Sequence, residues 1–240
     1  MEKKKLNIGL IGLGVIGSKI FELITDLESH NYSKLINVKT IVVKDLSKKR
    51  NFIFNKTKIS SNINDILDDE EIDLVVEVVG GESPAFDYIS KCLKSGKDVV
   101  TANKEVMAKR GLELLAIAKN SSTQLRFEAS VGGGIPIISS LKNDFSSNKI
   151  DGIRAIINGT TNYILTRMSN EGLSFREILN DAQKLGYAET DPTNDVEGFD
   201  STYKLAILTN LAFGAKVEIK KIYREGITNI KNKEFKYANE

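Results

Sequence analysis

Short runs rich in β-branched residues alternate with helical periodicity through the first half of the chain. The runs span Leu6–Ile11, Val38–Val43, Ile72–Val79, Asp98–Ala102 and Leu125–Ala129. Apolar residues line one face of a helix after the first run, and they are Ile16, Ile20, Phe21, Ile24 and Leu27. Further helices are expected at Val106–Ala118 and from Ser83 (N-cap) and Pro84 to Gly96. Continuous apolar strands separated by helices predict a doubly wound α/β domain with a parallel sheet.

The pattern changes after about residue 130. The expected elements are a helix opening at Ile135–Ile138, a strand at Ile153–Ile157, a helix between the capping box of Ser174 and Glu177 and its end at Gly186, and a helix at Asp200–Phe213. This mixture predicts an α+β class. We therefore expect two domains, residues 1–135 and residues 136–240.

Composition excludes several functional classes. The 240 residues include 34 basic and 32 acidic side chains, and the net charge of +2 argues against a nucleic-acid binder. No apolar run approaches the roughly 20 residues that cross a bilayer. The single cysteine, Cys92, permits no intrachain disulfide, and zinc has no ligand set. We expect a cytoplasmic protein without nucleic-acid or membrane partners.

A strand, a glycine-rich turn and a helix follow one another near the start of the chain. Gly12, Gly14 and Gly17 form a G-x-G-x-x-G pattern directly after the first strand. The first glycine permits a tight turn, the second lets a pyrophosphate approach the backbone, and the third lets helix and strand pack closely. The helix N-terminus offers free N–H groups to phosphates. These residues, with the intervening Val15 and Ile16, predict a Rossmann dinucleotide-binding site.

The second strand ends where a Rossmann fold reads the adenosine ribose. An acid there selects NAD, whereas a basic residue accommodates the 2′-phosphate of NADP. This strand ends at Lys44, with Asp45 next and further basic residues at Lys48–Arg50. The basic residues are either a clamp for that phosphate or a solvated turn. We expect NADP as the cofactor, with NAD as the alternative.

Two other strands end in residues that suit a ligand crevice. Gly80 follows Ile72–Val79, and Lys104 follows Asp98–Ala102. Ligands of open α/β sheets bind at the carboxyl ends of strands, near the switch in strand order. We therefore expect Gly80 and Lys104 at the cofactor site, with a plain surface position as the alternative for Lys104.

Acidic residues crowd the segment before the last predicted long helix. They are Glu189, Asp191, Asp195, Glu197 and Asp200, and Lys204 lies one helical turn after Asp200. The segment is either a solvated loop with an i,i+4 ion pair, worth a few tenths of a kcal/mol, or a carboxylate site for an ammonium group. The residue types alone leave both interpretations open.

Four segments together resemble the homoserine dehydrogenase family. They read T-A-N-K at 101–104, F-E-A-S-V-G-G-G-I-P-I-I at 127–138, N-G-T-T-N-Y-I at 158–164 and G-Y-A-E-T-D-P-T-N-D-V-E-G-F-D at 186–200. Lys204 belongs to the same pattern, and the match runs in order from Leu6 to about Gly226. The resemblance implies an NAD(P)-dependent oxidoreductase that reduces L-aspartate 4-semialdehyde to L-homoserine, in threonine and methionine biosynthesis.

The resemblance also implies roles for individual residues. Glu189 matches the residue that binds the substrate amino group, and Asp195 and Asp200 match acids that line the pocket. Thr160 is similar to a substrate-contacting threonine. The expected catalytic residues are Lys204 as proton donor, Lys104 as the second candidate for that role, and Asp200.

The segment Glu128–Ile135 resembles the family's monovalent-cation loop. There a glutamate and backbone carbonyls hold sodium or a similar ion, and hard cations favour such oxygen ligands. By position the ligands are Glu128, Val131, Gly133 and Ile135. A sharp turn between domains is the alternative use of the three consecutive glycines.

The chain ends in residues that read as the opening of a helix, whereas family members continue with further strands. We expect the first domain to bind the dinucleotide. The second domain, incomplete at its C-terminus, is expected to bind substrate and to carry the contact of a homodimer. Feedback control by threonine has no support in this chain. The rival interpretations are another amino-acid dehydrogenase on the same scaffold and a non-catalytic cofactor-binding protein.

Overall fold

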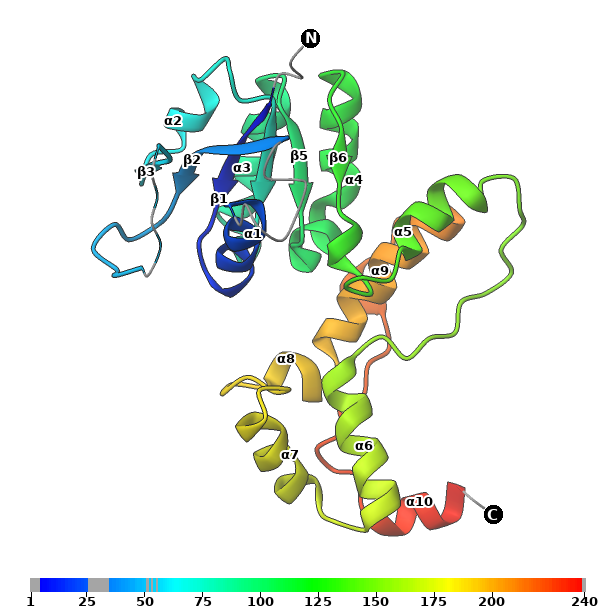
Figure 1. Cartoon of the computed structure of the whole chain (residues 1–240). Coiled ribbons are helices and arrows are strands. Elements are labelled where there is room, and N and C mark those ends of the chain that lie inside the picture. Colours follow the sequence, from blue (N-terminus) through cyan, green and yellow to red (C-terminus); the bar gives the residue numbers. More distant parts are fainter. Residues whose placement is uncertain (1–4, 26–34, 51, 53, 55, 239–240) are drawn as a thin grey trace. The chain divides into compact units, whose positions relative to one another are not determined.

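The computed structural model describes residues 5–25, 35–50, 52, 54 and 56–238. The chain divides into two compact units, Met1–Ile137 and Ile138–Glu240, which Figure 1 shows in colours that follow the sequence. The division falls close to the expected boundary at residue 135. Each unit has its own hydrophobic core.

The first unit is built on a parallel six-stranded sheet. Its strands are β1 (Leu6–Ile11), β2 (Ile36–Val42), β3 (Lys58–Ser60), β4 (Leu74–Glu77), β5 (Asp98–Thr101) and β6 (Leu125–Arg126). All neighbouring strands pair in parallel, in the order β3-β2-β1-β4-β5-β6. The strand order therefore reverses between β1 and β4, which is the doubly wound Rossmann order. This confirms the predicted fold class.

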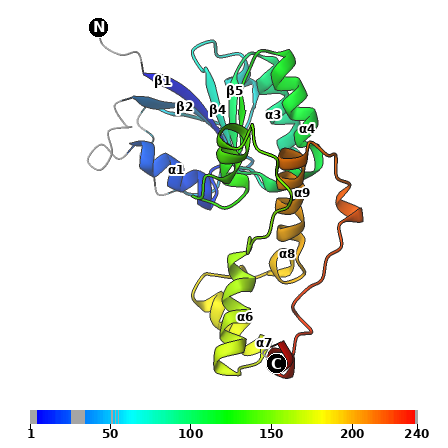
Figure 2. The same ribbon diagram turned by 90° about the vertical axis from the view of Figure 1, so that its right-hand side faces the viewer.

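Helices cover both faces of this sheet. They are α1 (Val15–Thr25), α2 (Asn64–Leu67), α3 (Ala85–Lys94) and α4 (Lys104–Asn120). The chain runs from β1 to β2 on one side of the switch point and from β4 to β5 and β6 on the other. Because these crossover connections are right-handed, α1 lies on one face of the sheet and the adjacent helices α3 and α4 lie on the other (Figure 2). The carboxyl ends of β1, β4 and β5 consequently meet at one edge, where α1 and α4 begin.

Buried aliphatic side chains form the centre of the sheet. Ile8, Leu10 and Ile41 are at most 1% exposed. On α1, Phe21 packs edge-on against Phe52, with ring centroids 5.5 Å apart. Full burial of one such side chain contributes about 1.5–3 kcal/mol, so these contacts hold α1 against the strands and fix the direction in which its first turn points.

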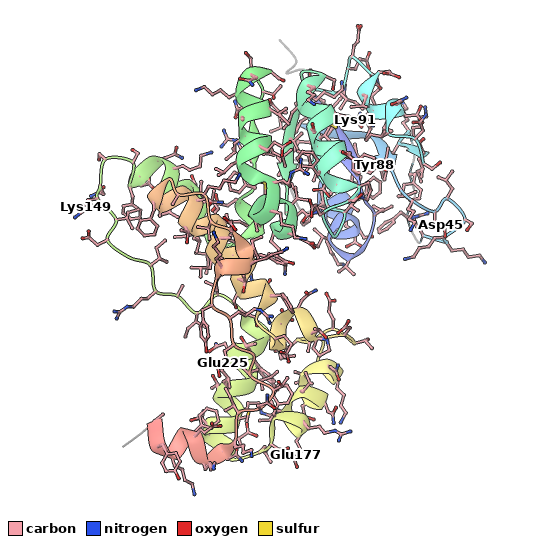
Figure 3. All side chains as sticks on the ribbon, turned by 180° about the vertical axis from the view of Figure 1, so that it is seen from behind. Asp45, Tyr88, Lys91, Lys149, Glu177 and Glu225 are labelled. Carbon is pink, nitrogen blue, oxygen red and sulfur yellow. The ribbon has the colours of Figure 1, made fainter. Side chains whose placement is uncertain are left out.

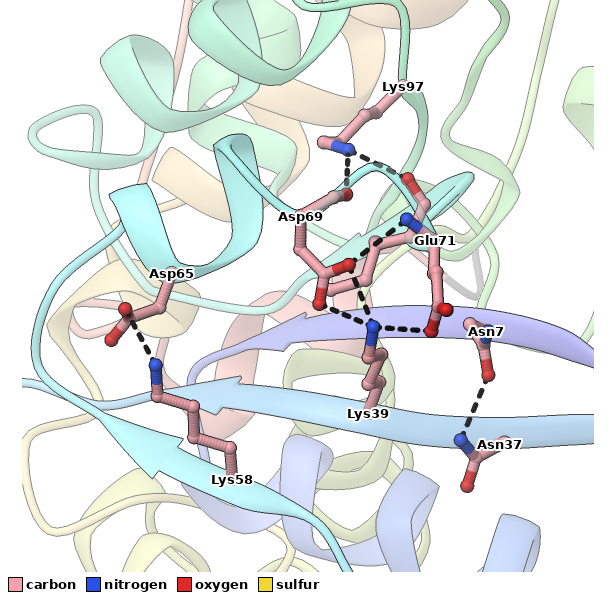
Figure 4. Close-up of polar contacts among 9 residues, drawn as sticks. Asn7, Asn37, Lys39, Lys58, Asp65, Asp69, Glu71 and Lys97 are labelled. Carbon is pink, nitrogen blue, oxygen red and sulfur yellow. Dashed lines mark hydrogen bonds and ion pairs between the residues drawn. The ribbon is translucent and has the colours of Figure 1, made fainter.

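A buried lysine fastens the amino ends of the strands. Lys97, which directly precedes β5, is 5% exposed and donates from Nζ to the carbonyls of Asp69 and Ile72 at 2.7 and 2.8 Å. The carboxylates of Asp69 and Glu71 pair with Lys39 of β2 at 2.8 and 2.6 Å (Figure 4). The turn between α2 and β4 is thereby tied to two strands, at the sheet edge opposite the glycine turn.

Several details of the first unit differ from the sequence-based expectation. β3 was not expected, because three residues show no recognisable alternation. The last strand is shorter than expected, because a 3-10 turn, η2 (Glu128–Ser130), begins directly after it. Pro84, and not Ser83, occupies the N-cap of α3, where no side chain caps the helix. On α1, Ile16 is 54% exposed, and Leu27 lies outside the described residues.

The second unit is helical in its described residues. Its elements are α5 (Ile137–Ser139), η3 (Ser140–Asp144), α6 (Gly159–Glu171), α7 (Phe175–Lys184), α8 (Thr193–Val196), α9 (Phe199–Phe213), η4 (Ile219–Lys221) and α10 (Asn232–Ala238). Its core cluster is Ile164, Met168, Ile178 and Val196. The predicted capping box of Ser174 and Glu177 is confirmed at α7. Within the described ranges, no helix is long and apolar enough to cross a membrane.

The predicted strand at Ile153–Ile157 is wrong. These residues belong to an irregular connection between η3 and α6, on which Figure 3 labels Lys149. A strand persists only where its N–H and C=O groups pair with a neighbouring strand, and none of the described residues after 137 is in a strand. The helices of the expected α+β domain are present, whereas a sheet is not formed by residues 138–238.

Candidate active site

The glycine turn lies at the switch point of the sheet. Gly12 has φ +98°, and a β-carbon there would stand 3.0 Å from the carbonyl oxygen of Val78, so the ends of β1 and β4 are adjacent. A β-carbon on Gly17 would collide with the carbonyl of Gly12. At Gly14, by contrast, no described atom lies within 4 Å of a β-carbon position. The turn therefore has the open space that a pyrophosphate needs, so its residues fit a dinucleotide.

The first turn of α1 is open beside this space. Val15 is 85% exposed and Ile16 is 54% exposed, although both are apolar. The exposed Gly80 follows β4 at the same edge of the sheet, and Lys104 is the first residue of α4 there. The structure thus brings these predicted cofactor residues to one edge of the first unit.

A buried polar network supports the loop that carries Gly80. Glu77 is fully buried and accepts hydrogen bonds from the Thr101 hydroxyl and the Val79 N–H, both at 2.6 Å. Asn103 donates from Nδ2 to two carbonyls of the loop, at 2.7 and 2.8 Å. Burial raises the pKa of the Glu77 carboxyl, and the hydrogen bond from Thr101 opposes this shift. These hydrogen bonds fix the backbone of the loop that follows β4 and carries Gly80.

In the loop after β2 the lysines are exposed to solvent, whereas the carboxylate of Asp45 is hydrogen-bonded within the loop. The Asp45 carboxylate accepts from the hydroxyl and N–H of Ser47, at 2.7 and 2.8 Å, and these bonds lower the pKa of Asp45 (Figure 3). Arg50 donates to the carbonyls of Asp45 and Lys48. Lys44 is exposed. Asp45 is thus engaged within its loop, while Arg50 braces that loop.

In the second unit, four predicted or neighbouring polar residues form one network. Lys204 Nζ lies 2.6 Å from Oδ2 of Asp200 and donates to the carbonyl of Ile157 at 2.8 Å. Asn158 Nδ2 donates to Oδ1 of Asp195 at 2.7 Å and to Oδ2 of Asp200 at 2.9 Å. The Asp200 side chain is 1% exposed and that of Lys204 is 17% exposed. The ion pair of Lys204 and Asp200 is therefore shielded from solvent, whereas Glu189 and Asp191 of the same segment are exposed.

The remaining substrate candidates lie apart from this network. Thr160, on the first turn of α6, is buried and donates to the carbonyl of Tyr187 at 2.8 Å. Glu189 is exposed, and its backbone carbonyl accepts from Gln183 at 3.0 Å. The structure shows no contact of the Glu189 carboxylate with Asp195 or Asp200.

Sequence reasoning gave no site role to Glu77 or Asn158, two of the residues in these networks. Asn158 entered the sequence analysis only as the first residue of the segment 158–164, and an asparagine N-cap is the feature that could have drawn attention to it. Glu77 lies inside an apolar strand, and the only sequence signal for its role is that it is a single acid in a strand expected to be buried. Neither pattern reveals the distant partners.

The glycine loop after η2 contains the predicted cation ligands. Gly132 and Gly133 have φ +78° and +59°, so the backbone reverses sharply there. The Ile135 carbonyl accepts from the Ile137 N–H at 2.8 Å and keeps a second lone pair. Glu128 adds a half-buried carboxylate. These are hard oxygen donors, which suit an alkali cation. Among the described residues no cluster of three His, Cys, Asp or Glu side chains could hold a metal ion.

The sheet order and the glycine turn at its switch point define the class of the first unit: a Rossmann-type dinucleotide-binding domain. Comparison with known proteins narrows this class. The family model of the homoserine dehydrogenase NAD binding domain matches residues 12–128, and that of homoserine dehydrogenase matches residues 136–240.

Individual relatives agree with the family models. Homoserine dehydrogenase of Bacillus subtilis is 42% identical over 238 residues, which are 98% of this chain and 55% of that protein. A structure from Archaeoglobus fulgidus, assigned as a homoserine dehydrogenase, is 30% identical with a TM-score of 0.85 and covers 98% of this chain and 76% of its own. A hyperthermophilic archaeal homoserine dehydrogenase mutant in complex with NADPH is 28% identical, with a TM-score of 0.80, over 95% and 76% of the two chains.

The chain belongs to the homoserine dehydrogenase family. It spans about 55% of the length of the first curated relatives it matches.

Proposed function

We propose that this chain catalyses the NAD(P)-dependent interconversion of L-aspartate 4-semialdehyde and L-homoserine. The observation that carries the proposal is the buried pair of Lys204 and Asp200, joined through Asn158 to Asp195, in a chain of this family. The network combines carboxylates for an amino-acid substrate with a cation that can donate a proton.

The glycine turn and the edge beside it would hold the cofactor. Gly12, Gly14 and Gly17 would receive the pyrophosphate, with Val15 and Ile16 on the open turn of α1 and Gly80 and Lys104 at the neighbouring strand ends. When bound, the nicotinamide supplies or accepts a hydride. The lysines of residues 44–49 support NADP over NAD, since Asp45 is occupied by Ser47 and these cations are exposed. The NADPH in the archaeal relative agrees with this choice.

Lys204 acts as the general acid in the reducing direction. A lysine ammonium has three N–H donors, and two of them face Asp200 and the carbonyl of Ile157. The third donor can reach the aldehyde oxygen, where it neutralises the alkoxide as the carbon accepts hydride. Asp200 orients the ammonium. Lys104 is the alternative proton donor.

The acids and one hydroxyl bind the rest of the substrate. Both homoserine and its aldehyde carry an ammonium group, and the carboxylates of Glu189, Asp195 and Asp200 supply the opposite charge. Thr160 is held by its bond to the carbonyl of Tyr187, so its hydroxyl oxygen is fixed for a substrate contact.

The proposal includes a monovalent cation and a second copy of the chain. Glu128 and the carbonyls of Val131, Gly133 and Ile135 would hold the ion and stiffen the loop.

A homodimer through the segment after residue 140 would cover its exposed apolar side chains, among them Ile156 at 80% exposure. Light scattering should then give a mass above the 26.6 kDa of one chain, and a monomer at every concentration would contradict the dimer. The cytoplasm is the compartment that the proposal assumes.

A spectrophotometric assay of homoserine oxidation, run with NADP and NAD side by side, tests the function. Cofactor binding is measured on the same sample by fluorescence titration. Turnover with homoserine supports the proposal. Tight cofactor binding without turnover would favour a non-catalytic binding protein, and turnover only with other amino acids would favour a dehydrogenase of different specificity.

A further inference from the structure

Asn158 is fixed at both ends of its side-chain amide. It is the N-cap of α6, and its Oδ1 accepts from the Thr161 N–H at 2.8 Å. Because that end accepts from a backbone donor, Nδ2 must face the other way, toward Asp195 and Asp200. Its two N–H groups reach those carboxylates at 2.7 and 2.9 Å. Asn158 is buried, with 6% of the residue exposed, so solvent does not compete for these bonds.

We propose that Asn158 is a positioning residue for the substrate-binding carboxylates: it sets the spacing and direction of Asp195 and Asp200 from the N-terminus of α6. This inference rests on the function proposed above and adds a residue that acts through those acids. Neither acid lies on α6, since Asp195 is on α8 and Asp200 on α9. The amide therefore joins three helices at the site.

The chemistry explains why an amide suits this place better than a charged donor. Two close carboxylates repel each other, and hydrogen bonds from one shared group stabilise both charged forms. A lysine or arginine there would also bring them together but would neutralise them. The uncharged amide orients both acids; because Asp200 is already paired with Lys204, it leaves the negative charge of Asp195 to attract the substrate ammonium.

Ile157, the residue before Asn158, positions the proposed proton donor Lys204 at the same turn of the backbone. The carbonyl of Ile157 accepts from Lys204 at 2.8 Å, and Lys204 also pairs with the oxygen of Asp200 that Asn158 binds. Two consecutive residues at the start of α6 therefore orient both the acids and the ammonium. A shift of this turn would change substrate binding and proton donation together.

Capping of α6 alone is the competing explanation, and two variants separate it from positioning. Asn158→Ser and Asn158→Gly are both accepted at N-cap positions, but neither retains the amide N–H groups. The matched control is Ser174→Ala, which removes the N-cap of α7 in the same unit without touching the acids. Homoserine binding is measured by calorimetry with the cofactor present, and KM, kcat and the thermal midpoint are measured on the same preparations.

Both Asn158 variants should raise the homoserine Kd and KM about ten-fold or more, the loss expected for hydrogen bonds to charged groups. Cofactor affinity should stay unchanged, and Ser174→Ala should lower the thermal midpoint without changing KM. Wild-type affinity for homoserine in the Asn158 variants would overturn the positioning role and leave the proposed function intact. A wild-type protein that binds no homoserine would contradict both.

Discussion

The ammonium nitrogen of Lys204 lies 2.6 Å from Oδ2 of Asp200, one turn earlier on helix α9. Both side chains are largely shielded from water. Removal of the cation from such a pair leaves a buried carboxylate without a partner, which is strongly destabilising. A test of Lys204 therefore needs a variant that keeps the positive charge beside Asp200, and Lys204→Arg provides it.

The glycine turn predicts opposite outcomes for two substitutions. Gly14→Val should abolish NADPH binding with little change in the thermal midpoint, because its side chain would enter the open space meant for the pyrophosphate. Gly17→Ala should lower the thermal midpoint, because its β-carbon would collide with the Gly12 carbonyl. Fluorescence titration and thermal unfolding measure both. Unchanged NADPH affinity in Gly14→Val would place the phosphate site elsewhere.

Cofactor choice is tested on the loop after β2. Replacement of Lys44, Lys48 and Lys49 by serine should weaken NADP about ten-fold and NAD much less, since only NADP has the additional phosphate. Arg50 is kept, because it braces the loop through two carbonyls. The control replaces three exposed lysines on α3 and α4, Lys91, Lys94 and Lys119 (Lys91 is labelled in Figure 3). Equal losses for NADP and NAD would mean that the loop is a solvated turn.

Glu77 predicts a pH dependence of stability. Burial raises the pKa of its carboxyl above the unfolded value, so between the two values the folded state binds more protons than the unfolded state. Its contribution to stability is then present at acidic pH and declines as pH rises through the folded pKa. Relative to Glu77→Gln, the wild type should lose stability as the pH rises above the ordinary glutamate pKa of about 4.3. Urea unfolding at several pH values measures this, and a difference that is constant with pH would contradict it.

Lys97 should matter for the fold and not for the cofactor. Lys97→Met leaves two carbonyls, those of Asp69 and Ile72, without their donor, which should cost about 1–3 kcal/mol of unfolding free energy. The exposed Lys94→Met is the matched control. Urea denaturation measures the loss. Equal stability of the two variants would show that Lys97 does not fasten the strand ends.

Elements marked by a local pattern of residues could be predicted from the sequence. Elements and contacts that depend on residues far apart in the chain could not. The five strands and the glycine turn of the first unit follow from apolar runs and glycine spacing. The three-residue β3 could not be recognised, because an edge strand this short has no pattern of its own. Ile153–Ile157 looked like a strand, but composition cannot show whether a neighbour is available for pairing. Asn158 likewise bonds to residues 37 and 42 positions away.

The central claim is that Glu189 binds the substrate ammonium and Lys204 donates the proton. Substitution of these two residues tests it most directly. Glu189→Ala should act mainly on KM, because the substrate ammonium is charged in both the ground and the transition state. Lys204→Ala should leave cofactor affinity intact and lower kcat by about 100-fold or more, since positioned proton transfer contributes about 10²–10⁴.

Steady-state kinetics of homoserine oxidation by the wild type, Lys204→Ala and Lys204→Arg decide the matter, with thermal midpoints as the control for folding. The account predicts a large loss of kcat in both Lys204 variants, including the folded Lys204→Arg protein, whose guanidinium does not give up its proton. Full turnover in Lys204→Ala would contradict the account and make Lys104 the next candidate for the proton donor.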